Sequence, residues 1–160
     1  MMRQNAARSA EVYRQQQVMT ATPEALTLML YNGAIKFINE SIEATKKKEY
    51  EKANTSCIKA QNIISEFRLT LKMEYEISKN LLALYNYAYD RLVEGNMNED
   101  ITKLEEAKDI LSELRDAWNQ AMKAFKRIIS SMLALVMFVS IFPLGVFAEG
   151  ENDNIYSITN

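Results

Sequence analysis

The 160-residue sequence contains no histidine, and this absence removes the usual components of many active sites. Histidine is the most frequent general base and the most frequent metal ligand in proteins. Without it the chain has no Ser-His or Cys-His pair, and it lacks the Glu-x-x-His motifs of di-iron helical bundles. The sequence also has no glycine-rich phosphate loop and no nucleophile elbow. We therefore expect a protein with no catalytic residue, no cofactor and no metal.

The number of cysteines and the net charge of the chain are also small. A single cysteine, Cys57, cannot form an internal disulfide, which is compatible with the reducing cytoplasm. The 19 basic and 21 acidic residues give a net charge of -2 and are interspersed, so the chain has no basic stripe for nucleic acid. Carboxylate pairs such as Glu105 and Asp109 share a helical face, where we expect them to be solvated. These features predict a cytoplasmic protein that does not bind nucleic acid.

Helix breakers are rare, since the chain contains only two prolines and four glycines. The long region between the prolines is therefore expected to be helical throughout. Thr22, Pro23 and Glu24 form a start signal, because Thr caps free amides, Pro fits the first turn and Glu complements the helix dipole. This first helix should extend to about Lys47. Residues 1–21 before it are polar and rich in glutamine, and we interpret them as a mobile arm.

Three further helices are indicated by the spacing of apolar residues. The second helix carries a stripe with alternating steps of four and three residues, which is typical of a bundle seam. That stripe consists of Ala53, Cys57, Ala60, Ile64, Phe67 and Leu71. Because Cys57 lies within it, we interpret this cysteine as a buried apolar residue and not as a reactive thiol.

The third helix should extend from about Tyr75 to Glu94 and end at Gly95 in the left-handed conformation. Asn98 is expected to cap the fourth helix. The apolar residues of the fourth helix are Ile101, Leu104, Leu111, Leu114, Trp118, Ala121 and Phe125. Short connections force neighbouring helices to lie antiparallel. The predicted fold is all-α, an antiparallel up-down-up-down four-helix bundle over residues 22–125 with an N-terminal arm.

Residues 128–148 contain no charge and follow a basic stretch at 123–127. They are numerous enough to span a bilayer, and their small-residue end before a polar sequence also resembles a secretory signal. Three interpretations stay open: an export signal joined to the bundle by a fusion or gene-boundary artefact, a membrane anchor, or an extra apolar C-terminal helix packed on the bundle. If the segment inserted, the bundle would remain in the cytoplasm. We assign 126–148 to this segment and 149–160 to a polar tail.

The first and third helices carry more apolar residues than a four-helix bundle can cover. On the first helix, a core stripe can be formed by Leu26, Leu30, Ala34, Phe37 and Ile42. A second stripe, predicted to bind a partner, consists of Leu28, Tyr31, Ile35 and Ile38. On the third helix, one stripe is Ile77, Leu81, Leu84 and Ala88, and the next is Leu82, Tyr85, Tyr89 and Leu92.

Leu82, Tyr85 and Tyr89 join the partner-binding candidates, although core packing of the tyrosines stays open because Tyr combines a large apolar ring with a polar tip. Large exposed apolar surface on a soluble monomer usually marks a binding site. A partner helix lying in a groove is the mode of recognition that fits such a surface.

The chain contains three stretches in this order: MTATPEALTLMLYNGAIKFI, KAQNIISEFRLTLKMEYEISKNLLALYNYAYDRLVEGN and LSELRDAWNQAMK. Over about residues 10–125 it resembles the family of the flagellar secretion chaperone FliS. Members of that family are cytoplasmic antiparallel helical bundles that bind the C-terminal segment of flagellin. They prevent its polymerisation and help to deliver it to the export gate component FlhA.

The resemblance implies flagellin and FlhA as partners and implies no catalysis or cofactor. It also matches Tyr13 to a family tyrosine in the N-terminal arm, a segment that can cover the groove when flagellin is absent. The part after about Phe125 has no counterpart in the family. A membrane-anchored helical adaptor held by residues 128–148 is therefore the alternative function, with the membrane as a partner only if that segment inserts.

Overall fold

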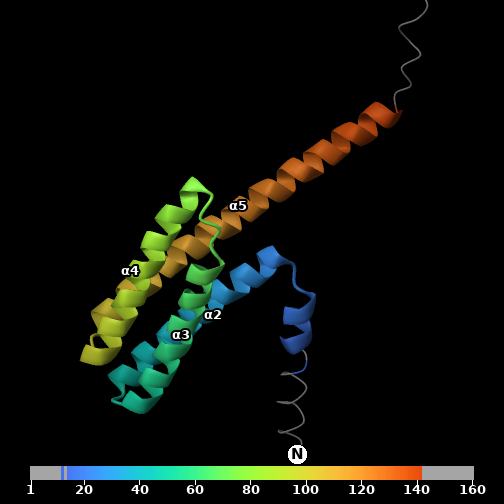
Figure 1. Ribbon diagram of the computed structural model, residues 1–160. Helices are drawn as coiled ribbons and strands as arrows, with labels where there is room; N and C mark the ends of the chain where they lie inside the picture. The colour runs from blue at the N-terminus through green and yellow to red at the C-terminus, as the bar shows by residue number, and fades with distance from the viewer. Residues whose placement is uncertain (1–11, 13, 142–160) are drawn as a thin grey trace, which may run out of the picture. The chain divides into compact units, whose positions relative to one another are not determined.

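The computed structural model describes Val12 and residues 14–141, with side chains as far as Met137. Every regular element among these residues is helical, which confirms the predicted all-α class. Residues 14–20 form a helix that the weak apolar pattern of the arm did not predict. The long helices that follow are α2 (Pro23–Lys46), α3 (Tyr50–Thr70), α4 (Glu76–Asn98) and α5 (Ile101–Ile141) (Figure 1). The described residues fall into two compact units that divide after Met122.

Helix α2 begins where the sequence predicts. The Thr22 hydroxyl accepts a hydrogen bond from the Ala25 amide at 3.3 Å, and Pro23 occupies the first turn. The helix ends at Lys46, next to the predicted end. Lys48 then adopts a φ of 60° in the connection to α3, a left-handed conformation that is uncommon for a residue with a side chain.

The end of α4 differs from the prediction. Gly95 is not left-handed but lies buried inside α4, and Glu99 caps the helix with a φ of 55°. A Cβ atom on Gly95 would lie 2.8 Å from Leu104 Cδ2 and 3.0 Å from the Asp100 carbonyl oxygen. The glycine therefore permits a close approach of α4 and α5. The cap of α5 is also different, because the Asp100 carboxylate, and not Asn98, accepts a hydrogen bond from a first-turn amide at 3.0 Å.

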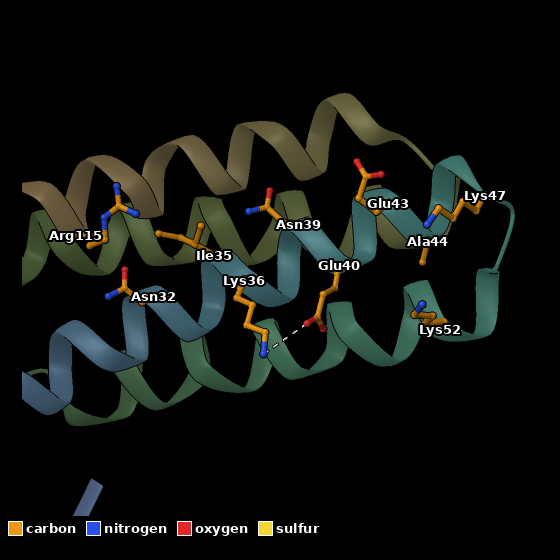
Figure 2. Close-up of a pocket in the computed structure, with 10 residues that line it drawn as sticks. All are labelled: Asn32, Ile35, Lys36, Asn39, Glu40, Glu43, Ala44, Lys47, Lys52 and Arg115. Atoms are coloured by element: carbon orange, nitrogen blue, oxygen red, sulfur yellow. Dashed lines mark ion pairs between the residues drawn. The ribbon is translucent and has the colours of Figure 1, made fainter. Parts of the chain in front are cut away.

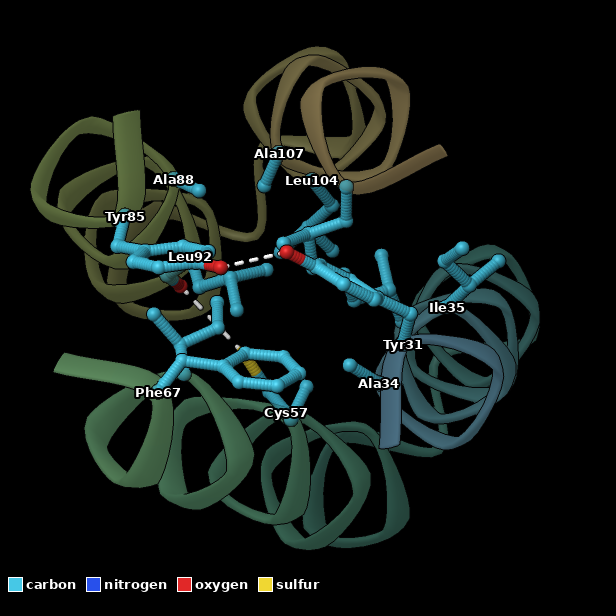
Figure 3. Packing of buried hydrophobic residues seen from close by; sticks show 14 of the residues in the cluster. Tyr31, Ala34, Ile35, Cys57, Phe67, Tyr85, Ala88, Leu92, Leu104 and Ala107 are labelled. Atoms are coloured by element: carbon cyan, nitrogen blue, oxygen red, sulfur yellow. Dashed lines mark hydrogen bonds between the residues drawn. The ribbon is translucent and has the colours of Figure 1, made fainter. Parts of the chain in front are cut away.

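The first unit has one apolar core, which is surrounded by α2, α3, α4 and α5 (Figure 3). The predicted stripe of α3 is confirmed, since Ala53, Cys57, Ala60, Ile64 and Phe67 are buried and Leu71 packs against the core. The Cys57 thiol is fully buried, as predicted, and burial raises its pKa. The Ser41 hydroxyl of α2 donates to the Ala53 carbonyl of α3 at 2.9 Å. The up-down-up-down order of the helices remains a prediction from their short connections.

The segment after Phe125 is not an additional helix. Residues 126–141 continue α5, which is one helix of 41 residues (Figure 1). The physical reason is that no glycine or proline lies between Gly95 and Pro143 to interrupt it. Among the helices that the structure describes, none combines the length and the apolar character needed to cross a membrane. The end of the uncharged run and the predicted polar tail lie at 142–160, outside the described residues.

Gly95→Ala is expected to destabilise the protein, although Ala normally favours a helix by about 1 kcal/mol over Gly. The added methyl group would collide with Leu104 and with the Asp100 backbone, and overpacking of this kind typically costs about 1–3 kcal/mol. Gly33→Ala is the matched control, because a Cβ atom there would meet Ile63 Cδ1 at 3.6 Å, an ordinary contact.

Urea unfolding followed by circular dichroism should give a lower midpoint for Gly95→Ala and an equal or higher midpoint for Gly33→Ala. An unchanged midpoint for Gly95→Ala would contradict the close approach of α4 and α5.

Candidate partner-binding surface

Half of the predicted partner-binding residues lie in the core. Tyr31 and Tyr85 are only 3% and 4% exposed, and Ile35 and Ile38 are also buried. The expectation that Tyr31, Ile35 and Ile38 form an outward stripe was therefore wrong, whereas burial of Tyr85 is the core packing that the sequence left open. The two stripes of α2 have partly exchanged places, because the stripe with Tyr31, Ile35 and Ile38 turns inward. The stripe proposed for the core is divided, with Ala34 and Ile42 buried and Leu26, Leu30 and Phe37 half-buried.

An aromatic cluster formed by Tyr31, Phe67 and Tyr85 explains this inward rotation. The Phe67 ring lies 4.5 Å from the Tyr31 ring and 5.3 Å from the Tyr85 ring, measured between centroids. The two tyrosine hydroxyls point toward one another and are 2.5 Å apart (Figure 3). Burial raises the pKa of both phenols. The hydroxyl pair thus satisfies two polar groups that would otherwise be unpaired in an apolar core.

Leu82 and Tyr89 are half-buried, and Tyr89 packs against the edge of the core while part of its ring stays exposed. They are about two helical turns apart on α4, and Val93 continues the same face. The Arg68 guanidinium of α3 lies 4.9 Å from the centre of the Tyr89 ring. Asn96 Nδ2, one turn beyond Val93, donates to Asn54 Oδ1 of α3 at 2.6 Å. Tyr89 and Asn96 therefore both contact α3, and Val93 lies between them on α4.

Helix α3 adds apolar side chains to this surface. Ile58 and Leu69 lie one turn and about four turns beyond Asn54, and both turn from the border with α4 toward the solvent-exposed side of α3. Ile58 is exposed, and Leu69 is the most exposed large apolar residue of α3 at 82%. We define the α3–α4 surface as Ile58, Arg68, Leu69, Leu82, Tyr89 and Val93. The sequence did not predict the α3 members, because stripe periodicity does not indicate which helices are neighbours.

Leu28 lies on another side of the bundle. It is half-buried and one turn beyond Glu24, whose carbonyl accepts a hydrogen bond from Trp118 Nε1 of α5 at 3.1 Å. Leu28 therefore faces α5 and does not share a surface with Leu82 and Tyr89. Tyr13 lies outside the described residues, so its predicted role is unaffected.

The α2–α5 side carries a pocket of about 530 Å³, whose residues are shown in Figure 2. Its lining consists of Asn32, Ile35, Lys36, Asn39, Glu40, Glu43, Ala44, Lys47, Lys52 and Arg115. Only Ile35 and Ala44 are apolar, and Lys36 forms an ion pair with Glu40 at 3.7 Å. Charged side chains of both signs border this open pocket, so it is not the apolar groove that the sequence predicted.

The described residues contain no group of three or more His, Cys, Asp or Glu side chains that could hold a metal ion. Glu105 and Asp109 are exposed, as predicted. The α3–α4 surface offers apolar side chains, the aromatic ring of Tyr89 and the guanidinium of Arg68. Such a surface can bind the apolar face of a helix.

Comparisons with known proteins agree on one family. A family model described as "Flagellar protein FliS" matches residues 4–125. The flagellar secretion chaperone FliS of Bacillus subtilis (strain 168) is 44% identical over 115 residues, covering 72% of this chain and 86% of that protein. The protein of the same name from Escherichia coli (strain K12) is 29% identical over 124 residues, covering 73% and 91%.

The fold is also similar to that of a solved structure. A chain described as "Crystal structure of flagellar chaperone from bacteria" superimposes with a TM-score of 0.60 at 17% sequence identity. The superposition covers 74% of this chain and 98% of the other. At this identity the likeness concerns the fold alone.

The hydroxyl pair in the core generates a prediction. Tyr31→Phe or Tyr85→Phe alone should destabilise the protein by about 1–3 kcal/mol, because each change leaves the other hydroxyl buried without a partner. The double variant should cost less than the sum of the two single changes, since both polar groups are then removed. Denaturant unfolding of the four proteins in a double-mutant cycle measures this coupling. Strictly additive effects would contradict a paired role for the hydroxyls.

Proposed function

The chain belongs to the FliS family of flagellar proteins, and from this we propose that it is a cytoplasmic export chaperone for flagellin. It binds the C-terminal helical segment of flagellin and prevents the subunit from polymerising before export. It then hands the subunit to the flagellar export apparatus through the gate component FlhA. Membership of a chaperone family, and not of an enzyme family, agrees with the absence of histidine from the sequence.

One observation carries the proposal: the α3–α4 surface keeps apolar side chains at the surface of an otherwise well-formed bundle. Leu69 is 82% exposed, and Leu82, Tyr89 and Val93 are half-buried. A partner helix with apolar residues on one face can bury these side chains by lying along α3 and α4. Tyr89 contributes a large contact area with a polar tip, and Arg68 holds its ring from one side.

The length of the surface suits a segment that folds as it binds. Coupled folding and binding typically buries about 1,000–3,000 Å², because apolar burial must offset the entropy lost when a disordered chain becomes a helix. Half-exposed apolar residues on α2, namely Leu26, Leu30 and Phe37, extend the available area beyond α3 and α4. Flagellin can therefore contact more than one side of the bundle.

The N-terminal arm has a regulatory role in this proposal. Tyr13 and its neighbours cover part of the apolar surface until flagellin displaces them, which hides that surface from water at modest net cost. The same arm contributes to docking on FlhA. Leu28 lies close to the start of α2. Of the predicted partner-binding residues that are not buried, it is therefore the one nearest in sequence to the arm.

The proposal predicts that Leu82→Ala combined with Tyr89→Ala weakens binding of a flagellin C-terminal peptide. The expected loss is on the order of 100-fold in Kd, because two large apolar contacts are truncated. The matched control is Ile77→Ala combined with Leu84→Ala, since these residues have the same seven-residue spacing, lie about 200° away on the same helix and are exposed. Isothermal titration calorimetry measures the affinity and should give a negative heat-capacity change for the wild type.

The test excludes Tyr85, because its removal would damage the core. Equal losses for the two double variants would show that the α3–α4 surface is not the binding site. The absence of detectable binding to the wild-type chain would remove the chaperone proposal itself. Circular dichroism of each variant separates a loss of binding from a loss of folding.

A further inference from the structure

Residues 123–137 of α5 form the second unit as far as its side chains are described, and nearly all of them are exposed. We call this stretch the basic–apolar segment. Its large apolar side chains range from 42% to 69% exposed. Those used below are Phe125, Ile128, Met132, Leu133, Leu135 and Met137. The family match ends at residue 125, so almost all of this segment lies outside it.

Large apolar residues cover somewhat more than half of the circumference of the later part of the segment. Successive helical positions differ by about 100°, so Leu135, Met132 and Leu133 follow one another around this broad apolar side. The remaining side carries the small residues Ser130, Ser131 and Ala134. A helix that pairs with a second copy in a coiled coil needs a polar outer face and about three or more heptads. The segment is only about two heptads long over residues 123–137, and no charged or amide side chain occurs between Arg127 and Met137. A helix with a broad apolar side and a narrow side of small residues suits the interface of a bilayer.

The charges of the segment are all of one sign. Lys123, Lys126 and Arg127 are exposed at its start. The sequence has no acidic residue between Asp116 and Glu149 to offset them. Basic residues placed directly before an apolar stretch are attracted to anionic lipid head groups, while the apolar side chains enter the acyl region.

We propose that the basic–apolar segment binds the surface of an anionic lipid bilayer. Lys123, Lys126 and Arg127 contact the head groups, and the apolar side chains from Ile128 onward enter the hydrocarbon layer. This contact requires no crossing of the membrane, in agreement with the helices that the structure describes. It does not depend on flagellin binding, because it uses a different unit of the chain.

Vesicle flotation of the full-length chain tests the proposal. The wild type should float with vesicles of phosphatidylcholine and phosphatidylglycerol, and more weakly with phosphatidylcholine alone. Changing Lys123, Lys126 and Arg127 together to Gln should weaken partitioning into the anionic vesicles by on the order of 100-fold. Its control is the same change at Lys46, Lys47 and Lys48, an exposed basic cluster of the first unit, which should leave partitioning unchanged.

A second pair of variants tests the apolar contact. Leu133→Glu with Leu135→Glu should abolish flotation with both kinds of vesicle, because carboxylates are expelled from hydrocarbon. Ile77→Glu with Met97→Glu adds the same charge to exposed apolar positions of α4 and should float like the wild type. Circular dichroism and size-exclusion chromatography with light scattering accompany each variant.

Three results would overturn the proposal. The first is an absence of flotation of the wild type with anionic vesicles. The second is an equal loss in the control variants. The third is a stable dimer in the absence of lipid that Leu133→Glu with Leu135→Glu converts to a monomer, since the apolar side chains would then pair with a second copy of the chain.

Discussion

A helix in a four-helix bundle can turn only one side toward the core, whereas α2 and α4 carry apolar residues on more than one side. This constraint determines which side chains are buried and which remain at the surface. Tyr31, Ile35 and Ile38 take the inward side of α2, so Leu26, Leu30 and Phe37 are left half-buried. On α4, Tyr85 turns inward, while Leu82 and Tyr89 stay at the surface. This division decides which apolar side chains of the first unit remain accessible to a partner.

The division is stabilised by close packing and by paired polar groups. Tyr31 and Tyr85 carry hydroxyls into the core, which is acceptable because the hydroxyls bond to each other. Gly95 permits α4 to approach Leu104 of α5 more closely than any larger residue would. The Tyr31–Tyr85 hydroxyl pair and the Gly95–Leu104 contact together fix the rotation of α4 about its axis. This rotation sets the direction in which Leu82 and Tyr89 point.

The two units of the chain offer different surfaces to different surroundings. The α3–α4 surface is a limited apolar stripe on a helical bundle, bordered by Arg68 and by polar residues. A protein helix of matching length can cover it. The basic–apolar segment has a broad apolar side after a run of bases, which suits a lipid surface. The proposed cargo site and the proposed lipid contact therefore lie in separate units of the chain.

The sequence by itself determined the helical class, the start of α2 at Thr22 and the single buried stripe of α3, because capping and periodicity are local properties. It also determined that no histidine-based chemistry is available. Only the tertiary structure decided that Tyr85 is fully buried while Tyr89 stays half-buried, and that Gly95 serves packing and not helix termination. Periodicity specifies the faces of a helix, but its rotation about its own axis depends on side chains of other helices, which local sequence does not contain.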